Sequence, residues 1–275
     1  MRLASNFSRT AHIVRSHSPL TDDQIRRAAP SIFAVDKHAS RSERYTYIPT
    51  IAVIEKLRAE GFQPFMACQS RVRDLGKREH AKHMIRLRHA TQAAGGDSPE
   101  IILLNSHDGS SSYQMLAGYF RFVCENGLVL GQKTHDVRVP HKGNVVDDVV
   151  AGAYEVLDGF NLIREVKDEM ASLQLAPPEQ HAFAKAALAL RYDTTEAPPP
   201  VTEAQILRPR RSADASDDLW TTLNRVQESL IRGGLQGRNA AGRRGRTREV
   251  TGIDQDVRLN RALWILADAL RERIR

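Results

Sequence analysis

The chain has 275 residues, of which 41% are hydrophobic and 27% charged, a composition typical of a globular protein with a sizeable core. No stretch approaches the roughly 20 consecutive apolar residues that a membrane-spanning helix needs, and the first residues lack the apolar segment of a signal peptide. The two cysteines, Cys68 and Cys124, exclude a disulfide framework and a cysteine-rich zinc site. We therefore expect a cytoplasmic protein that needs no cofactor and no metal.

The charge is segregated along the sequence. The formal net charge is +7, and residues 66–91 hold seven Lys or Arg against two acids. Residues 144–200 reverse this balance, with four basic and ten acidic residues, and residues 208–275 hold fifteen Arg, no Lys and nine acids. Two basic blocks around an acidic one are hard to explain by solubility alone and favour a polyanionic partner.

The first half of the chain predicts helices followed by an antiparallel sheet. A short helix is expected over residues 22–29, after the capping residue Thr21. A second helix begins at Pro49 and Thr50 and ends at Gly61. Strands are then expected at residues 65–73, 83–89 and 100–105. The turn residues between these strands predict an antiparallel meander.

Beyond the meander, apolar residues at helical spacing predict further helices. One is expected from Tyr113, and the residues that support it are Met115, Leu116, Tyr119, Phe120 and Val123. Strand structure follows over residues 128–139. The acidic stretch 144–174 predicts one long helix or a pair of helices, and another helix is expected over residues 179–192.

The proline run at 198–200 is the strongest boundary signal in the sequence. Beyond it we expect a helix capped by Asp217 and ended by Gly233 and Gly234, then an arginine loop, then a helix over residues 254–273. The predicted organisation is a lead-in (1–44), a core (45–193), a proline-rich linker (194–207) and an arginine-rich helical C-terminal lobe (208–275). The predicted fold class is α+β, with an antiparallel β-meander flanked by helices.

The strand over residues 83–89 alternates apolar and basic side chains, so Arg86 and Arg88 share one face. Together with Lys82, and with Arg71 and Arg73 from the neighbouring strand, they predict a basic platform suited to a phosphate backbone. The alternative is that these arginines cover a solvated sheet face and pair with the acidic helix.

The segment 237–248 places five arginines among Gly, Ala and Asn. Such a charged and flexible loop is expected to be ordered by a polyanion, with phosphate contacts from Arg243, Arg244, Arg246 and Arg248. The alternative is a disordered connector.

The segment from Asn105 to Gly109 most resembles an active site. His107 and Asp108 form a candidate general-base dyad or metal site, with Asn105 beside them. Adjacent strand residues point to opposite faces, however, so the two converge only within a turn. The alternative is a polar Asx-type turn. His80 and His83 have the spacing of a helical metal pair but lack a third ligand nearby.

Several motifs share one resemblance. In the core they are Arg44–Ile48, Glu60–Pro64, Ala67–Arg73, Ile102–Gly109, Gly118–Arg121 and Cys124–Leu128, and in the C-terminal lobe they are Leu219–Thr222, Asn224–Glu228, Arg232–Gly234 and Asn260–Trp264. These motifs resemble the YafZ/YfjQ-like family of phage- and plasmid-borne proteins, whose function is unknown. The helix–meander–helix order is also similar to the core of Rad52-type single-strand annealing proteins. That resemblance implies an oligomer that holds single-stranded DNA by its backbone.

We therefore expect a nucleic-acid-binding protein of a mobile element, which binds single-stranded DNA, anneals complementary strands in recombination and forms a homo-oligomer. Two alternatives stay open at this point. One is a metal-assisted nuclease or other hydrolase centred on His107 and Asp108, and the other is a protein-interaction or anti-defence factor.

Overall fold

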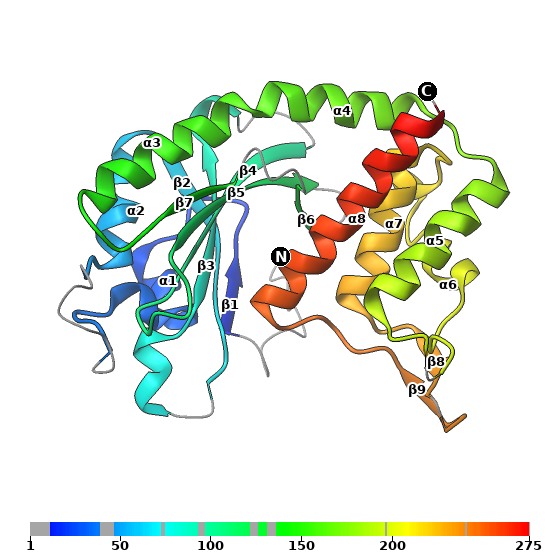
Figure 1. Ribbon diagram of the computed structural model, residues 1–275, viewed down its shortest axis with the longest axis horizontal. Helices are drawn as coiled ribbons and strands as arrows, with labels where there is room; N and C mark the ends of the chain where they lie inside the picture. The colour runs from blue at the N-terminus through cyan, green and yellow to red at the C-terminus, as the bar shows by residue number, and fades with distance from the viewer. Residues whose placement is uncertain are drawn as a thin grey trace. The chain divides into compact units, whose positions relative to one another are not determined.

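The computed structural model describes residues 12–38, 47–72, 75–92, 97–121, 126–130, 136–195, 197–239 and 241–274. The chain divides into two compact units (Figure 1). The first comprises Met1–Phe122 and Lys133–Phe160, and the second comprises Val123–Gln132 and Asn161–Arg275. The predicted α+β class is confirmed, because an antiparallel sheet and several helices build the first unit and helices dominate the second.

The first unit is built on an antiparallel sheet. Its strands are β1 (His12–Arg15), β2 (Phe62–Gln69), β3 (His83–His89), β4 (Asp97–Asn105), β5 (Tyr113–Arg121) and β7 (Val137–Val139). Strands β1 to β5 lie in the order of the chain, and β7 pairs with β5. The meander predicted from the turn residues is therefore confirmed, with β2, β3 and β4 at its centre.

Helices pack on the sheet within this unit. They are α1 (Asp22–Ala28), α2 (Thr50–Ala59) and α3 (Val145–Asp158), with short 3-10 turns η1 (Pro30–Phe33), η2 (Leu75–His80) and η3 (Ala90–Gln92). Helix α2 packs on β2 and on α3, and α3 also packs on β5 and β7 (Figure 1). The predicted starts of α1 and α2 are confirmed, and the side chain of Thr21 caps α1 in a capping box with Gln24.

The segment from Tyr113 to Arg121 is a strand, so the helix predicted there is wrong. Strand β5 pairs with β4 along its length, with Leu103 opposite Met115. Almost every side chain of β5 is buried, so both faces of the strand carry apolar residues. A strand buried on both faces has no alternating pattern, and its apolar run therefore matches the spacing of a buried helix equally well.

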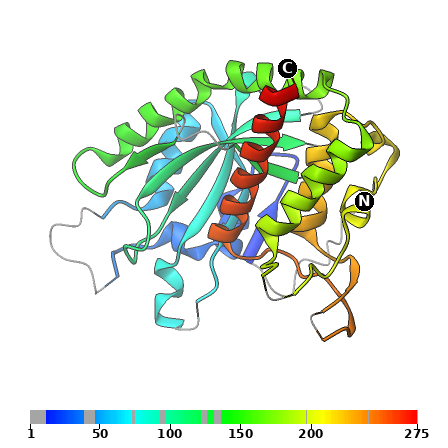
Figure 2. The same cartoon turned by 45° about the vertical axis from the view of Figure 1, so that its right-hand side comes forward.

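The second unit is mainly helical. Its elements are α4 (Phe160–Ser172), which begins at the boundary, α5 (Pro177–Arg191), α6 (Glu203–Leu207), α7 (Leu219–Arg232), α8 (Ile253–Ile274), the 3-10 turn η5 (Ser212–Asp214), and the strands β6 (Asn126–Val129), β8 (Gln236–Arg238) and β9 (Arg244–Arg246). Helices α5, α7 and α8 lie side by side and pack on one another (Figure 2). The unit therefore begins before the proline-rich segment, because α5 packs with the C-terminal helices.

Asp218 caps α7, one residue later than predicted. Its carboxylate accepts a hydrogen bond from the backbone N–H of Thr221 over 2.7 Å, whereas Asp217 pairs with the guanidinium of Arg225 at 3.3 Å. Within the described ranges, no helix has the length and apolar content needed to cross a membrane.

Candidate nucleic-acid interface

The arginine-rich segment predicted as a loop forms a short β-hairpin. Strands β8 and β9 pair antiparallel, and we call these strands with the turn between them, residues 236–246, the arginine ribbon. Asn239 organises the turn: its side-chain oxygen accepts from the Arg243 N–H over 2.9 Å, and its carbonyl accepts from the Gly242 N–H over 2.8 Å. Gly242 has a φ of 72°, a conformation that favours glycine. The segment is therefore a hairpin and not a disordered connector, and its phosphate contacts stay a prediction.

The ribbon carries its long side chains on one face. Arg238 lies opposite Arg244 and Gln236 opposite Arg246, with Gly237 and Gly245 paired between them. Because side chains alternate along a strand, the three arginines and Gln236 project to one side and the glycines face the other. Arg238, Arg244 and Arg246 are all exposed. The result is a two-stranded basic surface.

A close backbone contact fixes the ribbon to the proline-rich segment. The Arg238 N–H donates to the carbonyl of Pro200 over 3.0 Å. A Cβ atom on Gly237 would lie 2.1 Å from that same carbonyl oxygen, so only glycine fits at this position.

Gly237→Ala should therefore displace the ribbon from Pro200. We expect a loss of roughly 1–3 kcal/mol in local stability, because the backbone must shift to relieve the overlap. Hydrogen exchange of the Arg238 amide measures this, and exchange should accelerate in the variant. Gly245→Ala is the matched control, because a Cβ there meets nothing within 4 Å. Equal exchange in both variants would contradict the assigned contact.

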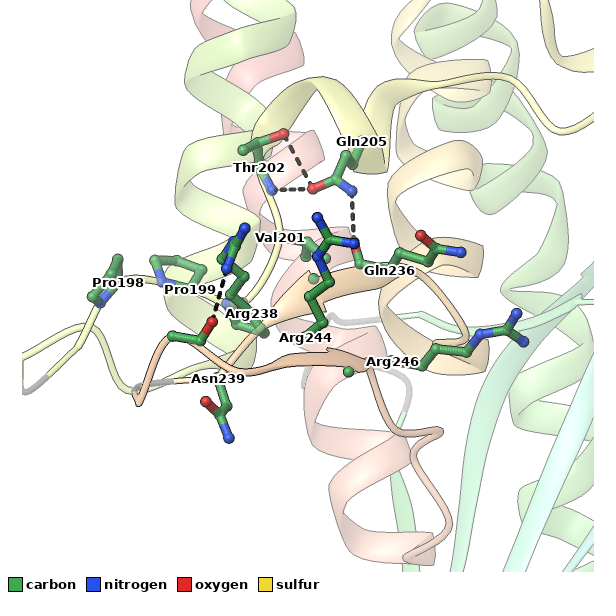
Figure 3. Close-up of a pocket in the computed structure, with 14 residues that line it drawn as sticks. Pro198, Pro199, Val201, Thr202, Gln205, Gln236, Arg238, Asn239, Arg244 and Arg246 are labelled. Carbon is green, nitrogen blue, oxygen red and sulfur yellow. Dashed lines mark hydrogen bonds between the residues drawn. The ribbon is translucent and has the colours of Figure 1, made fainter.

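A cavity of about 880 Å³ lies beside the ribbon (Figure 3). Its lining comes from three segments of the second unit: the proline-rich stretch 198–202 with Gln205, strand β8 with Asn239, and Gly242 with strand β9. Figure 3 shows Arg238 and Arg244 rising side by side between Pro199 and Gln236. Cationic, amide and apolar groups therefore meet around one space.

The ribbon arginines have no acidic partner among the described residues. The contact of Arg238 is a hydrogen bond from its Nη1 to the carbonyl of Gly242 over 2.9 Å, which fixes the side chain without neutralising it. Directly opposed like charges on a ribbon destabilise it. Arg243 and Arg248, which flank the ribbon strands, are exposed as well. An anion bound at this surface would relieve the repulsion.

The predicted basic platform on the sheet is wrong for Arg86 and Arg88. Both side chains are buried, at 4% relative exposure, and both pair with Glu100. The Arg88 guanidinium also lies between the rings of Phe65 and Phe120, 4.3 Å from each centroid. The two arginines do share a face, but that face holds a buried ion triad instead of a phosphate site.

Neither Arg71 nor Lys82 lies in a strand beside them. Arg71 is exposed and follows the end of β2, and Lys82 is partly buried just before β3. Arg73 lies outside the described residues.

Glu100→Gln should destabilise the first unit by roughly 3 kcal/mol, because it leaves two buried guanidinium groups without their counter-charge. Urea denaturation followed by circular dichroism measures the change. Glu55→Gln, at an exposed position on α2, is the control and should change the unfolding free energy by less than about 0.5 kcal/mol. Equal stability of the two variants would show that the triad contributes nothing.

The candidate catalytic segment belongs to a buried hydrogen-bond cluster around Thr50 on α2. The hydroxyl oxygen of Thr50 lies within 3.3 Å of side chains from β3, β4, β5 and the loop after β4, and we call this set the Thr50 hub. Its members are Thr50, His83, Asn105, His107 and Tyr113. All five are fully buried. The sequence indicated Thr50 only as a helix start, and long-range contacts of this kind leave no local signal.

Thr50 lies at the centre of the hub. Its hydroxyl oxygen accepts a hydrogen bond from Asn105 Nδ2 over 3.0 Å and lies 2.9 Å from His83 Nε2 and 3.2 Å from His107 Nε2. His83 Nδ1 contacts both the Ser31 hydroxyl at 2.8 Å and the Ala81 carbonyl at 3.1 Å. His107 Nδ1 is buried and has no hydrogen-bond partner in the described part of the chain.

Burial keeps these imidazoles neutral. It lowers the pKa of His83 to about 4, although the hydrogen bond to the Ala81 carbonyl acts in the opposite direction. Burial, reinforced by the nearby His83 and His141, lowers the pKa of His107 to about 2. It also lowers the pKa values of His80 and His141.

Stability should therefore fall in acid. In the unfolded chain these histidines titrate near 6.5, so between that pH and their folded pKa values the unfolded state binds more protons. The contribution of the neutral imidazoles to the free energy of unfolding is fully present above pH 6.5. As the pH falls toward 4, the free energy of unfolding decreases by about 1.4 kcal/mol per pH unit for each of His83 and His107. Urea midpoints between about pH 7 and pH 5 measure this slope. Replacing the exposed His181 with Gln should leave this slope unchanged. A urea midpoint of the wild type that does not change with pH would contradict the prediction.

Asp108 does not join His107 in a dyad. Its carboxylate accepts from the Ser110 N–H over 2.8 Å, and Gly109 has a φ of 78°, so the predicted Asx-type turn is confirmed. Burial alone would raise the pKa of Asp108, but hydrogen bonds from Ser110 and Ser106 lower it. His80 ends η2 and His83 begins β3, so they do not form a helical pair. No group of three or more His, Cys, Asp or Glu side chains in the described segments is arranged to hold a metal.

Comparison with known proteins identifies relatives along nearly the whole chain. A family model described as Domain of unknown function (DUF932) matches residues 37–264. UPF0380 protein YafZ of Escherichia coli strain K12 is 61% identical over 269 residues, which cover 98% of this chain and 97% of the relative. UPF0380 protein YfjQ of the same strain is 60% identical over 269 residues, which again cover 98% of this chain and 97% of the relative.

No solved structure matches the chain, so the similarity to Rad52-type annealing proteins stays a prediction. The resemblance to the YafZ/YfjQ-like family, drawn from the motifs of the sequence, is confirmed by both relatives. The chain belongs to the DUF932 family.

Proposed function

We propose that this protein binds single-stranded nucleic acid by its phosphate backbone, through the arginine ribbon. One observation carries the proposal: Arg238, Arg244 and Arg246 share one exposed face and have no acidic partner among the described residues. Arginine presents a planar fork of donors that matches phosphate oxygens in pairs. A fixed row of such groups is therefore suited to a repeating anion.

The charge of the whole chain supports the same partner. The formal net charge is +7, so the field around the protein attracts polyanions. Arg243 in the turn and Arg248 after β9 are exposed and extend the basic surface beyond the three ribbon arginines. The proposal moves the site predicted from the sequence away from β3, where Arg86 and Arg88 are paired with Glu100.

The Thr50 hub supports a structural role in preference to catalysis. Its members hydrogen-bond one another across α2, β3, β4 and β5 and are fully buried, so they hold the helix on the sheet. The nuclease alternative has no comparable observation in its favour. We further propose that the protein anneals complementary strands, assembles into an oligomer and lies in the cytoplasm. A strand-pairing assay tests the first claim, the mass of the assembly tests the second, and cell fractionation tests the third.

The decisive test is fluorescence-anisotropy titration of labelled single-stranded DNA with the full chain across a salt series. Three to five phosphate contacts predict that log K falls with log salt with a slope of roughly −2 to −3.5. Poly-glutamate serves as the control polyanion and should compete weakly, because a carboxylate chain does not match the spacing of phosphates. Absence of binding at low salt, or equal competition by poly-glutamate, would overturn the proposal.

A further inference from the structure

We propose that the cavity beside the arginine ribbon binds one unpaired nucleotide, with its phosphate between Arg238 and Arg244 and its base against Pro199. This inference rests on the proposed function and specifies its ligand. Backbone binding alone requires only the ribbon, whereas the cavity adds a place for a base.

The phosphate end of the site follows from the register. Arg238 and Arg244 are direct cross-strand partners, so their Cβ atoms are about 5 Å apart on the same face. The hydrogen bond from Arg238 Nη1 to the Gly242 carbonyl holds one guanidinium in place. Figure 3 shows the two side chains rising together from the ribbon. A phosphate between them accepts hydrogen bonds from both and removes their mutual repulsion.

The base end is an apolar wall of proline rings. The rings of Pro198 and Pro199 line the cavity on the side of β8. Gln236 lines it at the start of β8, whereas the Asn239 side chain points to the other side of the ribbon from the two guanidinium groups (Figure 3). The cavity is open to solvent, and its volume of about 880 Å³ leaves room for a small organic ligand. A flat heterocycle fits this combination, because its faces are apolar and its edges carry hydrogen-bonding groups.

The site selects single strands for a geometric reason. In a duplex each base is stacked and paired, so it reaches a protein cavity only after it is extruded from the helix, which costs several kcal/mol by typical values. An unpaired strand presents its bases without that cost. A duplex is therefore expected to use the ribbon arginines but to leave the cavity empty.

The experiment measures the affinity of the full chain for three probes at one salt concentration. They are oligothymidylate, an abasic strand with the same number of phosphates, and a duplex of the same length. Removing the bases should weaken binding about fivefold, which corresponds to some 40 Å² of apolar surface buried against the proline wall. Pro199→Ala should reduce the affinity for oligothymidylate and leave the affinity for the abasic strand unchanged. Pro209→Ala, at an exposed proline outside the cavity, is the matched control and should bind like the wild type.

The outcomes separate the two proposals. Binding of the abasic strand as tightly as oligothymidylate, by the wild type, overturns the nucleotide pocket and leaves the ribbon as a backbone binder. A duplex that binds more tightly than oligothymidylate also overturns the pocket. Absence of binding to all three probes overturns the proposed function itself.

Discussion

Replacement of all three ribbon arginines by alanine (R238A, R244A and R246A) should lower the affinity for single-stranded DNA at least about a hundredfold near 0.1 M salt. A hydrogen bond to a charged group contributes roughly 1.5–3 kcal/mol, and each arginine offers at least one such contact to a phosphate. The salt slope should fall by roughly 2, because about 0.7 is lost for each phosphate that is no longer neutralised. Anisotropy titrations across a salt series measure both quantities.

A charge-matched control separates this site from general attraction. Arg27, Arg138 and Arg273 are exposed on α1, β7 and α8, and their replacement by alanine removes the same three positive charges. This control should lose much less affinity than the ribbon variant. If both triple variants weaken binding equally, net charge and not the ribbon accounts for the affinity. A ribbon variant with wild-type affinity would contradict the site altogether.

Thr50→Val should destabilise the first unit by roughly 4 kcal/mol. The valine keeps the shape of threonine but removes the hydroxyl to which His83, Asn105 and His107 are hydrogen-bonded. Each buried polar group left without a partner costs about 1–3 kcal/mol. Equilibrium urea denaturation of the variant and the wild type gives the difference in unfolding free energy.

Thr50→Ser is the matched control, because it keeps the hydroxyl and removes only a buried methyl group. We expect it to lose about 1 kcal/mol. A valine variant that is as stable as the serine variant would show that the hub hydrogen bonds do not hold α2 on the sheet. Loss of nucleic-acid binding in a folded Thr50→Val protein would instead connect the hub to the function.

The fold was predictable where the sequence carries local signals. The alternation in β3 and the capping residue Thr21 both identify their elements, because each pattern reflects contacts between residues close in the chain. Strand β5 was not predictable in this way. Tyr119 and Phe120 are both buried on adjacent positions, and only the pairing with β4 determines that they belong to a strand.

The misplaced platform has a related cause. That Arg86 and Arg88 share a face follows from the two-residue period of a strand, but their burial depends on an acid elsewhere in the chain. Antiparallel pairing of β3 with β4 brings Leu87 opposite Ile101, and the next position brings Glu100 beside Arg88. The register of this hairpin was therefore a signal from which the ion triad could have been inferred.

The two sites differ in how far the sequence indicates them. Composition predicted phosphate contacts from Arg243, Arg244, Arg246 and Arg248 but not from Arg238, and the hairpin that aligns these side chains depends on glycines at positions 237 and 242. The Thr50 hub joins residues that are up to 63 positions apart, so its hydrogen bonds required the structure. For His107 and Asp108 the sequence left a dyad and a polar turn open, and it gave no indication of the contact between His107 and Thr50.

Hydrogen exchange of the full chain, with and without saturating single-stranded DNA, tests the ribbon as the binding site most directly. We expect the amides of residues 236–248 and of Val201 and Thr202 to become protected, while those of β3 and β4 exchange as before. Protection confined to the sheet, with no change in the arginine ribbon, would contradict it.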